Sequence, residues 1–425
     1  MTASDVHSIP LRRRKIRARI IMAILYTRVL IVTKFLFKPF FCDLNGSPCL
    51  EFRPYELPKA PYFQLLKLKF LWFRRIWADT SDAKLKARLD RKFAGTMTAI
   101  EDYMEKHGTV QTTEIPIPEF DWRNGSAEDF NRRFVQTPMP VVLRGYALES
   151  GAVGKWTFDY ILDKCGEVDV NLTGPDADWT GKLKEVRDPK IYCANADAPF
   201  ARYPELAEDL GIAKLKPYLH RDNTLNQFFI GQKATGSGYH CAGIWNFFYM
   251  IEGRKKWTFV DPALTWMMYP SISVSAVAFS SLILFPDTCD LSTYKLYKYC
   301  PRYSVELNPG DVLFNPPWWW HAVDNLTPTS IAVATRWDAM RSKGKDTSFY
   351  TLNRMLSTLA MVNPIFPGFL FRFLRDSTGK LGQVLRSGGG AFDEDVKVES
   401  ENQAFRHKNV YLGRVVEKIR AKEKW

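Results

Sequence analysis

The sequence predicts a mainly β protein with flanking helices, and three observations lead to that prediction. Seven short runs of apolar, β-branched and aromatic residues lie between residues 168 and 335, separated by turn residues, which favours a sandwich or a barrel. Patterns typical of helices lie before and after these runs. A hydrophobic content of 46%, with 13 Trp and 29 Phe in 425 residues, can fill a sizeable core and excludes wholesale disorder.

Residues 1–45 are expected to form a basic segment with an apolar anchor or targeting helix. Of the net charge of +13, residues 1–42 carry +8 and residues 43–94 carry +5. The apolar run Ile20–Phe41 follows an arginine cluster and resembles a transmembrane signal anchor, which predicts a membrane-associated protein, with the endomembrane lumen as one compartment. An organellar transit peptide and an amphipathic surface helix are the alternatives. Because the charge flanks this run, no nucleic-acid partner is expected.

A basic helical region is expected over residues 46–110, with a helix from Ser81 to His107 that begins at the capping residues Thr80 to Asp82. The proline-interrupted alternation from Thr109 to Pro118 predicts an extended lead-in to a domain over residues 111–345. Within this domain we expect a helix over 126–135, a buried strand that ends at Gly145, and a helix over 157–166.

The strands of the domain are predicted from short apolar runs bounded by turn residues. These runs are V-D-V-N-L, N-Q-F-F-I-G, W-N-F-F-Y-M-I, K-W-T-F-V, Y-S-V-E-L, D-V-L-F-N and S-I-A-V-A-T. The apolar stretch Ser271–Phe285 is too short to cross a bilayer and is interpreted as core or as a pocket wall. Residues 346–425 are expected to form a C-terminal helical region with a charged tail, and this region is a candidate for homodimerisation.

The seven cysteines contain no C-x-x-C pair, so neither a zinc site nor a redox motif of that kind is predicted. Cys42 and Cys49 follow the apolar N-terminal run, and Cys289 and Cys300 lie in one insert. Two short disulfide loops in an oxidising lumen and buried free thiols are both open interpretations.

Two aromatic-rich segments each carry one histidine, and they are the strongest functional signal. His240 lies in the segment Ser237–Pro262, and His321 lies in the segment Pro309–Leu326. Two histidines and one carboxylate on one face are the usual ligands of non-haem Fe(II) oxygenases. On a strand His240 would share its face with residue 242, which is an alanine and cannot bind a metal.

Residues 115–340, about half the chain, resemble the JmjC and cupin-like group of Fe(II)- and 2-oxoglutarate-dependent oxygenases. The resemblance is carried by Ser237, His240, Asn246, Gly253, Lys255, Trp257 and Pro262 in the first segment, and by Pro309, Gly310, Asp311, Trp319, Trp320 and His321 in the second. It implies a double-stranded β-helix, or jelly-roll, core. It also implies that His240 and His321 bind the metal, that Lys255 and Ser237 bind 2-oxoglutarate, and that Asn246 lies in the same cavity.

Other residues near these motifs are given structural or open roles. A buried Lys255 needs a counter-charge, which a dicarboxylate would supply, although the side chain could instead end in solvent. Arg336 is a candidate second carboxylate partner whose role stays open. We interpret the P-G-D turn at Asp311 as a structural bend, and Asp324 is expected on the face opposite His321.

The missing carboxylate leaves three outcomes: water fills the ligand position and an oxygenase survives, chloride fills it as in related iron halogenases, or the barrel is a binding module without turnover. The sequence favours an Fe(II)/2-oxoglutarate-dependent dioxygenase-type oxidoreductase, because Ser237, His240, Asn246, Lys255 and His321 all match the family pattern. The alternative is a catalytically inactive cupin-like binding module. The substrate cannot be read from these residues.

Overall fold

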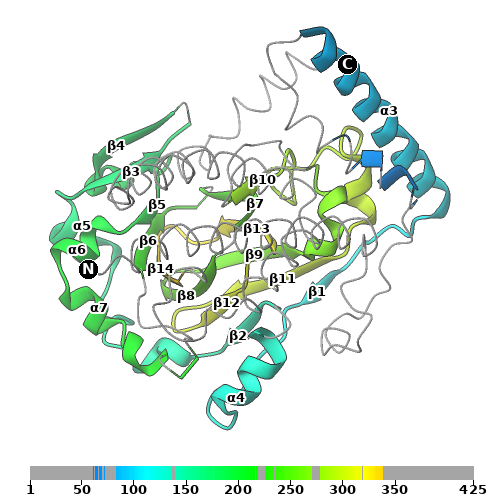
Figure 1. The fold of residues 1–425 in the computed structure, drawn as a ribbon. Coiled ribbons are helices and arrows are strands. Elements are labelled where there is room, and N and C mark those ends of the chain that lie inside the picture. The colour runs from blue at the N-terminus through cyan, green and yellow to red at the C-terminus, as the bar shows by residue number, and fades with distance from the viewer. Residues whose placement is uncertain are drawn as a thin grey trace, which may run out of the picture.

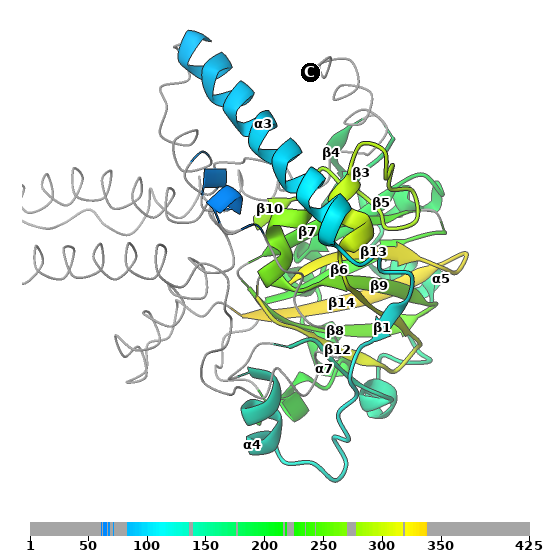
Figure 2. The ribbon, with the colours of Figure 1, turned by 90° about the vertical axis from the view of Figure 1, so that its right-hand side faces the viewer.

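The computed structural model describes residues 61, 63–65, 67, 68 and 71, together with residues 83–337 except 136–138, 176, 216, 219–224, 234, 243, 270–277 and 318. Two β-sheets face each other and form the core, as the strands in Figure 1 and Figure 2 show. The prediction of a mainly β fold with a jelly-roll core and flanking helices is confirmed.

The two sheets have six and eight strands, and neighbouring strands run antiparallel apart from the parallel pair β1 and β11. The six-stranded sheet has the order β1 (Glu114–Pro116), β11 (Arg302–Leu307), β9 (Lys255–Val260), β13 (Trp320–Asn325), β7 (Gly236–Ala242), β10 (Ala278–Ser280). The eight-stranded sheet has the order β2 (Val141–Leu143), β12 (Val312–Asn315), β8 (Trp245–Glu252), β14 (Ser330–Trp337), β6 (Leu225–Gly231), β5 (Tyr192–Ala196), β3 (Asp169–Thr173), β4 (Asp178–Lys182).

The predicted helices form where the sequence places their caps. Helix α4 (Ala127–Phe130) begins after Ser126, whose hydroxyl accepts from Asp129 N, and continues as a π-helical turn over Asn131–Val135. Helix α5 (Phe158–Cys165) begins after Thr157, which accepts from Tyr160 N. The remaining helical segments are α3 (Ala83–His107), α6 (Ala198–Arg202), α7 (Glu205–Asp209) and 3-10 turns at Tyr146–Glu149, Leu183–Arg187, Ile212–Leu215, Pro262–Met267 and Lys295–Tyr299.

Helices cover the outer faces of both sheets. The inner faces of the two sheets point toward each other, and the interior between them is called the lumen. Helix α3 lies across the six-stranded sheet (Figure 2), where Met97, Ile100 and Met104 join a buried cluster with Trp320. On the eight-stranded sheet, the Phe130 ring lies 5.2 Å from the Phe314 ring. This packing buries one face of each strand and leaves the alternate residues to line the lumen.

Strands β4 and β5 were not among the runs expected from the sequence. The residues of β4 are all exposed or half-buried, because β4 is the edge strand of its sheet, so the strand lacks an apolar pattern. In β5, Asn195 adopts a positive φ of 59°, and the register with β6 shifts between Cys193 and Ala196. Both strands therefore lack the regular alternation on which a strand prediction depends.

The prediction of a transmembrane helix, and with it a membrane-associated location, is corrected. Among the residues that the structure describes, no helix combines the length and the apolar surface needed to cross a bilayer. Helix α3 has 25 residues, about 37 Å at 1.5 Å per residue, but charged residues such as Lys84, Arg88 and Asp90 occur throughout it. The run Ile20–Phe41 itself lies outside the described residues, as do residues 346–425 with the candidate dimer region.

The apolar insert and its cysteines are described in part. Residues 278–280 form strand β10, which pairs with β7, so this part of the insert belongs to the core; residues 271–277 lie outside the described ranges. Cys289 and Cys300 are free thiols, which decides that pair in favour of the free-thiol interpretation. Cys42 and Cys49 lie outside the described ranges.

Candidate functional site

The two histidines of the sequence motifs meet inside the lumen. His240 on β7 and His321 on β13 are directly opposite in the strand register, and their ring centroids lie 4.2 Å apart. The His321 side chain is buried and stacks on Trp257, with 5.2 Å between ring centroids. The structure thus brings together two residues that are 81 positions apart in the chain; that they bind a metal stays a prediction.

Hydrogen bonds to the backbone orient both imidazoles. Nδ1 of His240 lies 2.8 Å from the carbonyl oxygen of Gly238, and Nδ1 of His321 lies 2.9 Å from that of Trp319. A carbonyl oxygen can only accept, so Nδ1 of each ring carries a proton, and in the neutral imidazole Nε2 then carries the lone pair. Neutral imidazole held by such an outer hydrogen bond is the form in which histidine binds metal ions.

No carboxylate completes a metal site within the described part of the chain. Ala242 lies two residues beyond His240 and pairs with Ala278 across the strands. No group of three His, Cys, Asp or Glu side chains among the described residues could hold a metal ion. Asp324 is three residues past His321 on β13, which places it on the opposite face of the sheet, as expected.

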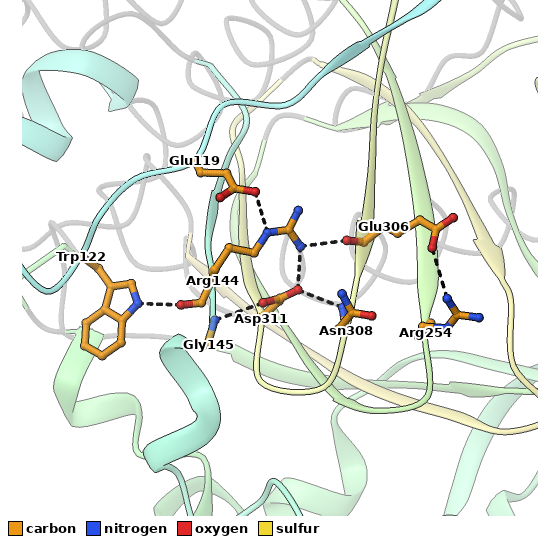
Figure 3. Close-up of polar contacts among 8 residues, drawn as sticks. All are labelled: Glu119, Trp122, Arg144, Gly145, Arg254, Glu306, Asn308 and Asp311. Carbon is orange, nitrogen blue, oxygen red and sulfur yellow. Dashed lines mark hydrogen bonds and ion pairs between the residues drawn. The ribbon is translucent and has the colours of Figure 1, made fainter.

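Asp311 is held by the turn that it ends, which agrees with its predicted structural role (Figure 3). Its carboxylate accepts from Arg144 Nη1 at 2.7 Å, Gly145 N at 3.0 Å and Asn308 N at 2.9 Å. The side chain is buried, and Arg144 Nε also donates to Glu119 Oε1 at 2.8 Å. These contacts join β12 to the end of β2, and both oxygens of the carboxylate accept hydrogen bonds.

Two asparagines of the opposite sheet face the histidines. Asn246 on β8 and Asn315 on β12 are directly opposite in the register, and their side chains are 4% and 5% exposed. Asn315 Nδ2 lies 3.4 Å from His321 Nε2, while the Oδ1 atoms of both asparagines are buried and have no hydrogen-bond partner among the described residues. Asn246 was expected in the cavity. Asn315 was missed, although its signal was an amide at an inward-facing strand position.

A β-bulge brings Ser237 onto the same face as His240. His240 is opposite His321 and Ser237 is opposite Val323, so three steps on β7 correspond to two on β13. Without this extra residue, Ser237 would point out of the lumen. The Ser237 hydroxyl instead hydrogen-bonds Tyr192, and burial raises the pKa of that phenol, which keeps it neutral.

Lys255 is fully buried in the lumen, so the alternative that its amine ends in solvent is wrong. Its Nζ donates to Asn325 Oδ1 and, at 3.2 Å, to Ser330 Oγ, and it lies 5.5 Å from the centroid of the Tyr192 ring. Within the described residues no carboxylate pairs with this amine. Burial lowers the pKa of Lys255 to about 7. The surroundings are those of a cation that lacks an anion.

A second cation, Arg336, lies on the inner face of the eight-stranded sheet. It is opposite Asn246 in the register, and its Nη1 donates to Asn195 Oδ1 at 2.7 Å and Gln227 Oε1 at 2.9 Å. Burial lowers the pKa of Arg336 to about 10, so it stays charged at neutral pH. The partners of Arg336 are neutral amides in the part of the chain that is described. The lumen therefore holds two basic side chains, of which Arg336 stays charged at neutral pH, and favours an anionic ligand.

Comparisons with known proteins agree with the resemblance seen in the motifs. The cupin-like domain family matches residues 177–343. Jumonji C domain-containing protein 5 of Drosophila melanogaster is 24% identical over 275 residues, which is 56% of this chain and 68% of that protein. The tRNA wybutosine-synthesizing protein 5 of Mus musculus is 26% identical over 268 residues, which is 55% and 81% of the two chains. Lysine-specific demethylase 8 of Xenopus tropicalis is 28% identical over 246 residues, or 54% of each chain.

Proposed function

We propose that this protein is an Fe(II)- and 2-oxoglutarate-dependent oxygenase, because residues 177–343 match the cupin-like domain family and two motifs resemble those of the JmjC group. The observation that carries the proposal is the fully buried amine of Lys255, which faces the same lumen as the paired imidazoles of His240 and His321. A buried cation without a counter-charge is costly, and a dicarboxylate bound next to the metal would supply that charge.

The side chains of the lumen fit both groups chemically. His240 and His321 would hold Fe(II) through Nε2. The buried oxygen of Asn315, which has no hydrogen-bond partner among the described residues, is a further hard donor nearby. Bound Fe(II) and 2-oxoglutarate supply the activation of oxygen for oxidation of the substrate. The two carbonyl contacts at Nδ1 would orient the imidazoles toward a metal, and the aromatic rings of Trp257 and Phe259 would exclude water.

Lys255 would bind the far carboxylate of 2-oxoglutarate, with the hydroxyls of Ser237 and Tyr192 as hydrogen-bond donors beside it. Arg336 lies across the lumen and would compensate the remaining negative charge of the co-substrate. The names of two relatives point to different substrates, a lysine and a tRNA, so no substrate is carried over. No contact in the described residues favours chloride at the position next to Ala242.

The proposal is tested by anaerobic titration of the full chain with Fe(II) and 2-oxoglutarate. We expect a visible metal-to-ligand charge-transfer band and saturable co-substrate binding. Lys255→Met should weaken 2-oxoglutarate binding at least about thirtyfold, equivalent to about 2 kcal/mol, because a buried ion pair is lost. Lys256→Met is the matched control, because Lys256 lies on the other face of β9 and pairs with Glu114 at 3.1 Å.

Two results would count against the assignment. If neither the band nor saturable binding occurs, the iron and 2-oxoglutarate function is wrong. If both occur but aerobic incubation with the metal never consumes 2-oxoglutarate, the binding-module alternative is correct. Equal loss in Lys255→Met and Lys256→Met would show that general destabilisation, and not the buried amine, controls binding.

A further inference from the structure

We propose that the amide oxygen of Asn315 takes the ligand position that a carboxylate at residue 242 would hold. The metal site would then consist of two imidazoles from the six-stranded sheet and one amide from the eight-stranded sheet. This inference rests on the proposed iron site and specifies how that site is completed. It assigns a role to Asn315, whose contact with His321 exists only because the two sheets face each other.

The position of Asn315 agrees with that role. It ends strand β12 with its side chain turned into the lumen, because its neighbour Leu313 lies opposite the inward-facing Phe248. Its terminal amide is 3.4 Å from His321 Nε2, the atom that carries the lone pair. Two donors that bind one cation at right angles, each at about 2.1 Å, lie about 3.0 Å apart. Asn315 is therefore within reach of a cation bound to His321.

The orientation of the amide is the second observation. In the structure Nδ2 faces His321 Nε2, and Oδ1 is buried with no hydrogen-bond partner in the described part of the chain. Oxygen and nitrogen of an amide exchange places when the group turns about its last torsion. After that turn Oδ1 and Nε2 would face each other as two acceptors, which is favourable only with a cation between them. The turned Nδ2 needs an acceptor, and Asn246 Oδ1, on the residue opposite, has no hydrogen-bond partner within the described residues.

This donor set differs in charge from one with a carboxylate. Two imidazoles and an amide are all neutral, and the nearby Lys255 and Arg336 are basic. A divalent ion should therefore bind weakly by itself and tighten when the dianionic co-substrate is present. A carboxylate at position 315 should attract the metal ion directly, so metal binding should depend less on 2-oxoglutarate. A side chain without a donor atom at position 315 should remove one metal ligand.

The test uses Co(II), whose visible absorption reports its ligand set, titrated into the full-length protein with and without 2-oxoglutarate. Asn315→Ala should weaken Co(II) binding at least tenfold and change the spectrum, and Asn315→Asp should tighten it at least tenfold. Asn308→Asp makes the same chemical change on an exposed turn and should leave Co(II) affinity within twofold. Thermal unfolding of each variant controls for folding.

A double variant checks the substitution of one ligand for another. In Ala242→Asp the carboxylate completes the site, so adding Asn315→Ala should then cost less than threefold in Co(II) affinity, although the same change costs at least tenfold in the native background. Equal losses in both backgrounds would overturn the inference, because Asn315 would then act elsewhere.

The remaining outcomes separate this inference from the proposed function. If the native protein binds Co(II) and Asn315→Ala binds it equally well, Asn315 is not a ligand while the iron site stands. If Asn315→Ala binds more tightly than the native protein, the amide blocks the position, and the inference is wrong. If native protein, Asn315→Asp and Ala242→Asp all fail to bind Co(II), the iron site itself is absent, and both proposals fail.

Discussion

At the scale of single residues, Lys255 is the group whose chemistry the fold changes most. Burial lowers the pKa of its amine to about 7, so the amine of the free protein is mostly neutral at pH 8.5. A bound dicarboxylate favours the ammonium form and raises this pKa again. Binding of 2-oxoglutarate at pH 8.5 should therefore take up close to one proton, and binding at pH 6 should take up almost none.

Calorimetric titration in two buffers with different ionisation enthalpies measures this proton uptake. The Lys255→Met variant, at concentrations high enough to saturate it, should show no uptake at pH 8.5. If the native protein shows the same binding enthalpy in both buffers at that pH, Lys255 does not meet the carboxylate.

Asp324 gives a pH dependence of folding that is separate from the site. Burial, and then the nearby Asp287, raise the pKa of this carboxyl to about 6, while Lys256 opposes them. Because the folded pKa is raised above the unfolded one, the stability that this group contributes is fully present below about pH 3.8 and is lost as the pH rises through 6. Asp324→Asn should remove this loss.

The expected gain of Asp324→Asn at pH 7.5 relative to pH 4 is roughly 1–2 kcal/mol, reduced from the full linkage value because the side chain is only half-buried. Urea unfolding of both proteins at the two pH values measures the difference. A native protein and a variant with parallel pH profiles would show that Asp324 has its ordinary pKa.

At the scale of elements, the turn between β11 and β12 shows how a motif can be structural (Figure 3). Asp311 accepts three hydrogen bonds in a buried position, whereas Glu306 contacts Arg254 at 3.4 Å with both side chains about half exposed. We expect Asp311→Ala to lower the free energy of unfolding by about 3 kcal/mol, because the donors that it contacts lose their acceptor in a buried position. Glu306→Gln should cost less than about 1 kcal/mol.

Denaturant titration measures the free energy of unfolding of these two variants, and equal losses would contradict a structural role for Asp311. The Asp311→Ala variant also separates an effect on stability from an effect on metal binding. Asp311→Ala should lower stability while a refolded, saturated sample still binds Co(II), because none of the Asp311 contacts reaches His321.

At the scale of the whole molecule, the sequence predicted those parts of the site that follow a pattern. His240, His321, Lys255 and Ser237 were predicted from the resemblance of two motifs to a known family, and the structure places all four in one lumen. Capped helices and alternating strands were found for the same reason.

The missed residues lie where no periodic signal exists. Tyr192 and Asn195 come from the irregular strand β5, and Gln227 was hidden within an apolar run. Asn315 was counted as the end of a strand, because only the packing of two sheets shows that its amide reaches His321. Contacts between sheets join residues that are distant in sequence and leave no local pattern.

Substitution of Ala242 tests whether the native domain catalyses oxidation with 2-oxoglutarate. Ala242 is half-buried and lies two residues beyond His240 on β7, so Ala242→Asp places a carboxylate on the same face as His240. An anionic ligand should tighten Fe(II) binding at least tenfold, equivalent to about 1.4 kcal/mol, because it adds a charge interaction in a partly buried site. We expect the native protein to consume 2-oxoglutarate and the variant to do so at lower Fe(II) concentrations. Oxygen uptake and loss of 2-oxoglutarate measure this. Activity that occurs only in the variant would show that the native lumen binds its ligands without oxidising a substrate.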